Sequence, residues 1–158
     1  LHLNMSDWDI LRKTYKIKGN LGAGTYGTVA LVKHRETKKV YAAKHLKNFM
    51  DSKYRSKMAL RELQLMIQLS NMKNNIFITK IHDVVLAGDN DKFTSLFIVM
   101  DYVEQDLCSM IQDKDIDFER AHALTILYNI LCGLKFLNSA DVIHRDLKPQ
   151  NILVTNDC

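Results

Sequence analysis

The chain has 158 residues, of which 47% are hydrophobic and 25% charged, and a formal net charge of +4 at pH 7. These proportions are typical of one folded domain; no apolar run is long enough to span a membrane, and residues 1–10 lack the features of a secretory signal. Cys108, Cys132 and Cys158 are odd in number and far apart, which favours free thiols, and no basic stripe with interleaved aromatics points to nucleic acid. We therefore expect a cytoplasmic or nuclear protein that binds neither membrane nor nucleic acid.

Residues 1–14 show no clear periodicity, so we expect an N-terminal extension that lies on the domain. From Tyr15 to Leu21 an alternating pattern predicts a strand that enters a glycine-rich turn, and Thr28–Lys33 predicts the returning strand. Glycines at this spacing let the backbone approach phosphate oxygens, although a plain hairpin has the same pattern. A dinucleotide-binding fold is disfavoured because a β-branched strand, and not a helix, follows the glycines. The turn residues are Gly22, Ala23, Gly24, Thr25, Tyr26, Gly27 and Val29.

A further strand, Val40–Lys44, is apolar and ends in a lysine, and a helix is expected from Ser52 to about Ser70. One face of this helix carries Glu62 among apolar residues. A carboxylate on an inward face is costly unless a cation pairs with it, so we expect a Lys44–Glu62 ion pair. The alternatives are a lysine that points into water and a surface Glu62 paired with Lys57. The apolar residues of that face are Ala59, Leu63 and Met66.

Two more strands, Ile81–Leu86 and Ser95–Asp101, are expected on either side of the turn at Gly88–Asp91. The second strand leads into the polar segment 101–106. Such a segment offers backbone groups to a flat heterocycle, and a later carboxylate can meet a ribose hydroxyl, but an ordinary strand-to-helix loop has the same composition. We place a lobe boundary between residues 102 and 103.

The remaining residues predict mainly helix. Leu107–Gln112 is a short helix candidate, and a longer helix is expected from about Phe118 to Asn138 with Asp117 as its N-cap. The longer helix has a broad apolar face that needs a cover. Its members are Leu124, Leu127, Leu131, Leu134 and Leu137. Residues 152–154 predict a final strand.

Between the long helix and the last strand, residues 144–151 read His-Arg-Asp-Leu-Lys-Pro-Gln-Asn. This segment matches the catalytic loop of protein kinases, in which the aspartate meets a substrate hydroxyl and the asparagine reaches magnesium. A polar turn around the single proline is the alternative. Together with the glycine turn, Lys44 and Glu62, the segment gives four motifs in kinase order. The chain therefore resembles eukaryotic protein kinases from about Tyr15 to Cys158.

The closer resemblance is to the mitogen-activated protein kinases, with the cyclin-dependent kinases as neighbours. The segments that carry it are Leu60–Leu63, Ile98–Leu107 and Gly133–Ile143. The slot that reads Val-Ala-Ile-Lys in kinases departs here at Tyr41 and Ala43, which are expected to pack.

The resemblance implies a serine/threonine kinase that uses ATP and Mg2+, with protein substrates that carry Ser/Thr-Pro sites and an upstream activating kinase. The implied catalytic residues are Asp146, Lys148, Lys44 and Glu62. The implied ATP-binding residues are the seven of the glycine turn with Ala42, Lys44, Met100, Asp101, Val103, Asp106 and Asn151. Asn151 would also bind the metal, and Arg61 and Arg145 would bind a phosphate on an activation loop.

The implied fold is α+β and kinase-like. Residues 15–102 would form an N-terminal lobe with a five-stranded antiparallel sheet and one helix, and residues 103–158 would form part of a helical lobe. The printed sequence stops before an Asp-Phe-Gly motif, so we expect the 158 residues alone to be inactive. A non-catalytic fragment that binds nucleotide or a partner protein is the alternative. The mass of the protein in its source discriminates between the two.

Overall fold

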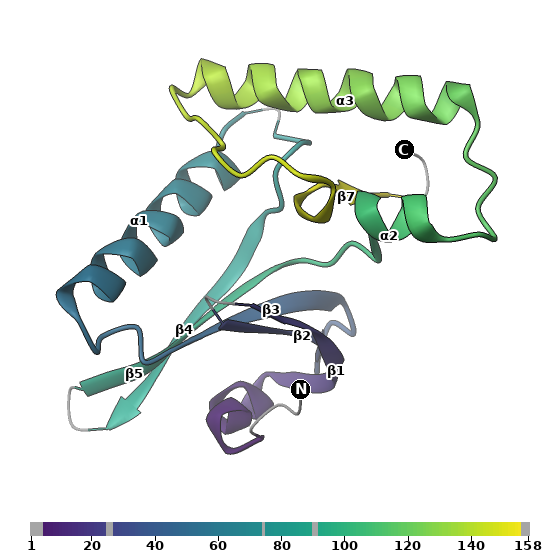
Figure 1. Ribbon diagram of the computed structural model, residues 1–158. Coiled ribbons are helices and arrows are strands. Elements are labelled where there is room, and N and C mark those ends of the chain that lie inside the picture. Colours follow the sequence, from purple (N-terminus) through teal and green to yellow (C-terminus); the bar gives the residue numbers. More distant parts are fainter. Residues whose placement is uncertain (1–4, 25–26, 74, 90–91, 156–158) are drawn as a thin grey trace. The chain divides into compact units, whose positions relative to one another are not determined.

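The computed structural model describes residues 5–24, 27–73, 75–89 and 92–155 (Figure 1). The chain divides into two compact units. The first unit comprises Leu1–Lys73 and Thr79–Tyr102, and the second comprises Asn74–Ile78 and Val103–Cys158. Among the described residues, no helix is both long enough and apolar enough to cross a membrane.

The first unit contains an antiparallel five-stranded sheet in the order β1-β2-β3-β5-β4, as predicted. Chain neighbours β1 and β2, β2 and β3, and β4 and β5 pair with one another, and β3 pairs with β5. The strands are β1 (Tyr15–Gly24), β2 (Gly27–His34), β3 (Val40–Lys47), β4 (Ile81–Asp89) and β5 (Lys92–Asp101). Two residues of the expected turn between β4 and β5, Asn90 and Asp91, lie outside the described residues.

The sheet is buried on both faces, which explains why its central strands are apolar almost throughout. Successive residues of β5 point to opposite faces, so Phe97 and Val99 belong to one core while Leu96 and Ile98 belong to the other. The first core also contains Trp8, Leu11, Tyr15, Ala30, Val32 and Ala43. The second contains Leu46, Phe49 and Ala59, with Leu63 and Met66 packed against it. The predicted inward face of the helix is thereby confirmed.

A 3-10 helix, η1 (Met5–Lys13), supplies two residues of the first core. Trp8 and Leu11 are each only 1% exposed, and the indole ring lies edge-on to the rings of His45 and Phe97, with centroids 5.4 and 5.2 Å apart. Side chains three residues apart lie above one another in a 3-10 helix. The N-terminal segment is therefore packed into the core although its sequence has neither the period of a strand nor that of an α-helix.

Helix α1 (Lys53–Ser70) crosses the second core. Ser52 is its N-cap, and the Ser52 hydroxyl accepts a hydrogen bond of 3.2 Å from the Arg55 N–H. The backbone N–H of Ile81 at the start of β4 donates to the Ser70 hydroxyl at 3.1 Å, which ties the last turn of α1 to the edge strand. The helix bounds agree with those expected from the sequence.

The second unit has a small core built by two helices and a two-stranded sheet. Leu107, Ile126 and Val154 form this core. The rings of Phe77 and Phe136 lie 5.9 Å apart and attach residues 75–78 to the long helix. The elements are β6 (Gln105–Asp106), α2 (Leu107–Gln112), α3 (Arg120–Ser139), η2 (Pro149–Asn151) and β7 (Leu153–Val154).

The start of α3 differs from the prediction. Asp117 is not the N-cap; Glu119 is, and the helix begins at Arg120. The Glu119 N–H donates to the Nδ1 atom of His122 at 3.2 Å, in a capping box that places the first turn two residues later. The prediction failed because it considered only the preferred N-cap residue types and overlooked an imidazole as the reciprocal partner.

The burial of Trp8 predicts that Trp8→Ala lowers the free energy of unfolding by about 3–5 kcal/mol, because the loss of the indole leaves a cavity that the neighbouring side chains fill only in part. Chemical denaturation followed by circular dichroism measures the change. Ile10→Ala in the same 3-10 helix is the control, since Ile10 is exposed and should cost far less. Equal losses for the two variants would contradict the core assignment of η1.

A second prediction concerns α3, where four large apolar side chains are each more than half exposed. They are Leu124, Leu127, Tyr128 and Leu131, which follow the spacing of one helix face. We expect the purified chain to bind an apolar dye and to self-associate in light scattering. The double variant Leu127→Gln/Leu131→Gln should reduce both signals.

The control for this experiment is Leu60→Gln, which removes an equally exposed leucine from α1. It should leave most of the dye signal intact. A parent chain that scatters as a clean monomer and takes up no dye would show that the α3 face is covered in solution.

Candidate functional site

The glycine turn joins β1 and β2, and Thr25 and Tyr26 within it lie outside the described residues. Gly22 pairs with Val29 across the two strands, after an irregularity in the register between Asn20 and Gly22. The Asn20 side-chain oxygen accepts the Gly22 N–H at 3.1 Å. Apart from its chain neighbours, no atom of the described residues would lie within 4 Å of a Cβ atom on Gly22, so there is room for a group to approach the backbone at this position.

Gly27 has a different reason to be glycine. Its φ angle is +146°, and a Cβ atom at this position would lie 2.0 Å from the carbonyl oxygen of His45 on β3. The fold itself therefore requires Gly27, because β2 passes too close to β3 for any side chain. A tight hairpin with no role in phosphate binding, the alternative given above, is enough to explain why residue 27 is glycine. It does not explain why residue 22 is glycine.

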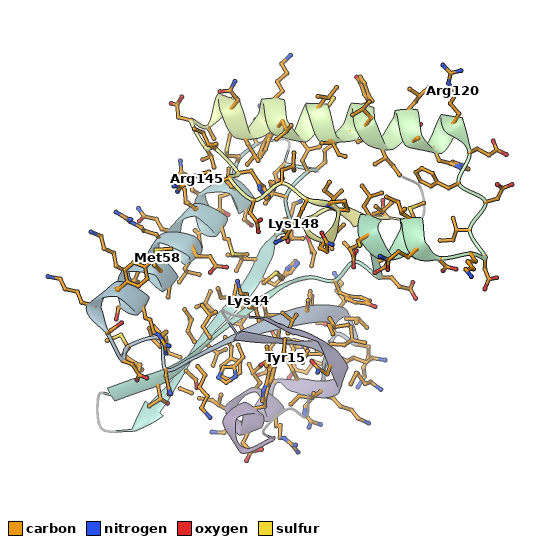
Figure 2. All side chains as sticks on the ribbon, in the orientation of Figure 1. Tyr15, Lys44, Met58, Arg120, Arg145 and Lys148 are labelled. Carbon is orange, nitrogen blue, oxygen red and sulfur yellow. The ribbon has the colours of Figure 1, made fainter. Side chains whose placement is uncertain are left out.

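Lys44 lies on β3 between Val29 of β2 and Ile98 of β5. Its side chain is labelled in Figure 2. The Nζ atom donates to the Oε1 atom of Glu62 on α1, so the predicted ion pair is present. The side chains are 23% and 36% exposed, respectively. The pair is thus sheltered between sheet and helix, yet open enough for a ligand to reach the ammonium group. Neither a lysine directed into water nor a Glu62 paired with Lys57 is found.

Three of the proposed nucleotide-binding residues share one face of the sheet. Ala42 and Lys44 are two residues apart on β3, and Met100 is the cross-strand partner of Ala42 on β5. Met100 packs against the core beneath α1, and Ala42 is buried. The structure therefore places an apolar strip of two side chains beside the lysine. Contact of this strip with adenine stays a prediction.

Asp101, expected to offer backbone groups, has a further structural task. Its carboxylate accepts the Lys80 N–H at 2.8 Å and bonds to the Nε2 atom of His82 at 2.6 Å. Its own N–H donates to the Lys80 carbonyl at 3.0 Å. Asp101 therefore fastens β4 to the end of β5, and a ligand could use only its carbonyl. Sequence patterns gave no signal for the Lys80 and His82 contacts.

Asp106 caps helix α2. Its Oδ1 atom accepts the Ser109 N–H and its Oδ2 atom accepts the Ser109 hydroxyl, both at 2.9 Å. The hydrogen bond from the Ser109 backbone lowers the pKa of Asp106 below its usual value. Aspartate is a preferred N-cap residue and directly precedes the expected helix Leu107–Gln112, so the bond to the Ser109 N–H could have been predicted. A carboxylate has lone pairs beyond these two bonds, so a sugar hydroxyl can still be bound. Val103 is the first residue of the longer segment of the second unit, and its role stays a prediction.

Asp146 and Asn151 are brought together by the short helix η2. Proline at the first position and the Asn151 N–H bond to the Lys148 carbonyl at 2.9 Å turn the chain back on itself. The Nδ2 atom of Asn151 then donates to the Asp146 carbonyl oxygen at 2.7 Å and to its Oδ2 atom at 2.9 Å. Because both partners are acceptors, the amide must direct its nitrogen to them, which leaves Oδ1 of Asn151 on the other side.

Lys148, labelled in Figure 2, completes this cluster. Its Nζ atom lies 3.0 Å from the Oδ2 atom of Asp146. The hydrogen bond from Lys148 is the largest cause of a lowered pKa at Asp146, and the bond from Asn151 is the next. The Asp146 carboxyl is therefore fully ionised at neutral pH. Among the described residues no group donates to its Oδ1 atom.

Arg145 has a φ angle of +61°, in the left-handed region that non-glycine residues rarely adopt. Next to it, the Asp146 N–H donates to the Nδ1 atom of His144 at 3.3 Å. Such local strain is typical of residues held for function. Arg61 lies on α1 in the first unit, and a shared phosphate between the two arginines stays a prediction.

The magnesium ligand predicted from the sequence is a single residue, Asn151. Among the described residues there is no group of three or more histidine, cysteine or acidic side chains that could hold a metal ion. Magnesium takes oxygen ligands and usually keeps several waters, so it does not need such a cage. The Oδ1 atom of Asn151 is an oxygen of the right chemistry, and its amide is held in place by Asp146. The residue present fits the metal as one ligand.

Comparison with known proteins gives a consistent result. The family model described as "Protein kinase domain" matches residues 15–158. Mitogen-activated protein kinase MPS1 of Pyricularia oryzae is 35% identical over 149 residues, which cover 94% of this chain and 35% of that protein. Mitogen-activated protein kinase spm1 of Schizosaccharomyces pombe is 37% identical over 146 residues, which cover 91% of this chain and 33% of that protein. Mitogen-activated protein kinase homolog NTF6 of Nicotiana tabacum is 36% identical over 138 residues, which cover 87% of this chain and 36% of that protein. The chain spans about a third of the length of these relatives.

The cluster around Asp146 predicts that Lys148→Met raises the pKa of Asp146 toward its ordinary value of 3.8, because the principal hydrogen-bond donor to the ionised form is lost. Carboxyl-carbon NMR titration measures it. Lys135→Met on the exposed side of α3 is the control and should not move the titration. A pKa that stays unchanged in Lys148→Met would show that Asn151 alone holds the carboxylate.

Proposed function

Because the chain belongs to the protein kinase domain family, we propose that the protein transfers the γ-phosphate of ATP to serine and threonine side chains of other proteins. The similarity to mitogen-activated protein kinases supports an enzyme of that kind. The observation that carries the proposal is a pair of preassembled clusters: Lys44 bonded to Glu62, and Asp146 bonded to Lys148 and Asn151.

In this proposal the first unit binds ATP. The backbone around Gly22 approaches the phosphates, since beyond its chain neighbours none of the described side chains lies within 4 Å of a Cβ position there. Lys44 keeps one hydrogen bond to Glu62 and has two further N–H donors for phosphate oxygens. The ion pair thus aims the ammonium group before the ligand arrives, which reduces the entropy lost on binding. Ala42 and Met100 provide the apolar surface for the adenine ring.

The catalytic step depends on Asp146. Its Oδ2 atom is held by Lys148 and Asn151, so the carboxylate is fixed in orientation while Oδ1 accepts the hydrogen bond of the substrate hydroxyl. A lowered pKa makes Asp146 a weak base, which suits a residue that orients the hydroxyl and takes its proton late in the transfer. Lys148 carries a positive charge beside the same carboxylate and stabilises charge on the group being transferred.

Magnesium, when bound, would neutralise charge on the phosphate oxygens of the nucleotide. In this chain Asn151 would hold it through Oδ1, because its Nδ2 atom is committed to Asp146. The same two hydrogen bonds therefore orient both the base and the metal ligand. A change at either residue disturbs the other.

We also propose the partners of such an enzyme. Protein substrates with Ser/Thr-Pro sites and an upstream activating kinase follow from the similarity to mitogen-activated protein kinases. Arg61 and Arg145 are the proposed ligands of a phosphate that the activating kinase adds. Guanidinium groups suit that task because they bind phosphate through two parallel hydrogen bonds.

The test uses the protein at the length found in its source, with radiolabelled ATP and a serine/threonine-proline peptide. Lys44→Met and Asp146→Asn should each reduce phosphate transfer by a factor of about 100 or more, because each removes a principal positioning or electrostatic group. Lys44→Met keeps the aliphatic stem of the lysine, so the fold should stay nearly intact.

Lys53→Met at the start of α1 is the matched control, since Lys53 is exposed. It should retain full activity. Turnover that persists in Lys44→Met or Asp146→Asn would overturn the assignment. Nucleotide binding without any transfer by the parent protein would instead favour the non-catalytic alternative.

A further inference from the structure

The positive charge of the chain is concentrated in one segment. Residues 10–40 contain eight lysines and arginines and a single acidic residue, Glu36. The net positive charge of this segment exceeds the +4 of the whole chain, so the other residues together carry a net negative charge. The segment comprises the end of η1 with strands β1 and β2, and the proposed mechanism gives no task to any of its charged side chains. Such a local surplus attracts anions.

Within this segment the structure has a pocket of about 280 Å³. It is lined by Arg12, Tyr15, Lys16, Ile17 and Arg35, all of the first unit. Tyr15, at the start of β1, is labelled in Figure 2. Three cationic residues, one from η1, one from β1 and one directly after β2, therefore border one concave site together with Tyr15 and Ile17 of β1. A volume of this size suits one anionic side chain or a small anionic group.

Arg35 is held in place by the fold. Its backbone N–H donates to the Thr14 carbonyl at 2.9 Å, and its Nε atom donates to the Arg12 carbonyl at 2.7 Å. Among the described residues its terminal nitrogens have no partner. Because a guanidinium group has five N–H donors in a fixed plane, one bond through Nε orients the remaining donors for a ligand. The arginine is thereby preorganised.

Lys16 and Lys33 face each other across β1 and β2. Like charges directly opposite one another destabilise a sheet, and in the described part of the chain no carboxylate pairs with either lysine. An anion bound beside them would remove this repulsion. The sheet register is thus a second, independent observation that points to a negatively charged ligand.

One carboxylate reaches the pocket residues. Asp9 lies 3.0 Å from the Nε atom of Arg12, with side chains 65% and 45% exposed. Exposed ion pairs of this kind contribute little free energy. A ligand with more negative charge than one carboxylate would therefore displace Asp9 and recruit Arg12.

We propose that this pocket binds the phosphate of a phosphorylated peptide segment. A phosphate ester carries about −1.5 to −2 charges at neutral pH, which matches a site with several cations and one weakly held carboxylate. Nucleic acid is disfavoured because, of the described residues in η1, β1 and β2, no aromatic side chain is exposed for base stacking. A membrane surface is disfavoured because the cations line a cavity, whereas a bilayer meets a flat or protruding face.

The experiment measures fluorescence anisotropy of a labelled peptide with one phosphoserine, and of the same peptide without phosphate, on the purified protein. We expect the phosphopeptide to bind about tenfold more tightly or better. Lys16→Gln and Lys33→Gln should each weaken it by about threefold or more, and raised salt should weaken it further. Arg35→Lys should also weaken phosphopeptide binding, since the positive charge remains but the planar guanidinium group that can form two parallel hydrogen bonds is lost.

Lys57→Gln on α1 is the matched control and should leave binding unchanged. Lys57 is exposed, and α1 contributes no residue to the lining of the pocket. Thermal melting checks that every variant is folded, which matters for Arg35 because it holds the end of η1. Equal affinity for the two peptides, or Lys16→Gln without effect, would overturn the proposal. Lys16-dependent binding to anionic vesicles or RNA, with none to the phosphopeptide, would overturn it as well.

Discussion

The Lys44–Glu62 ion pair is the interaction on which the proposed nucleotide site of the first unit depends. It connects the middle of the sheet to α1, so the position of a charged side chain on β3 is set by the packing of a helix on the second core. Ala59, Leu63 and Met66 hold α1 against that core, and Glu62 lies within the same stripe. Any displacement of the helix therefore moves the carboxylate away from the lysine. A partly exposed pair contributes little to stability by itself, and its value lies in the direction it gives to Lys44.

The cluster in the second unit depends on local contacts instead. Asp146, Lys148 and Asn151 lie within six residues, and the bonds among them are formed by one short turn that begins at Pro149. Such a turn needs no distant partner to set its geometry. The two clusters are thus built on different principles, the one in the first unit by tertiary packing and the one in the second unit by local sequence. That difference explains why the catalytic segment is recognisable from eight consecutive residues, whereas the lysine–glutamate pair requires residues eighteen positions apart.

The sequence predicted the sheet, both main helices and the ion pair because each produces a regular period or a costly residue that needs a partner. It failed where neither signal exists. Trp8 and Leu11 follow the period of a 3-10 helix, and a pattern of only two residues cannot be distinguished from chance. The bonds of Asp101 to Lys80 and His82 depend on strand register, which no local pattern specifies. The N-cap at Glu119 depends on a histidine as the reciprocal partner, an uncommon choice.

Several residues proposed to bind the nucleotide also serve the fold, and this limits what a loss of function can prove. Gly27 is required by the close approach of β3, and Asp106 caps α2, so a substitution at either residue would disturb the structure before it affected nucleotide. Gly22 differs, because a methyl group there would meet none of the described residues beyond its chain neighbours. A defect caused by a side chain at Gly22 would therefore arise from a group that occupies this space in the complex. The glycine that the fold does not need is the one that can report on the ligand.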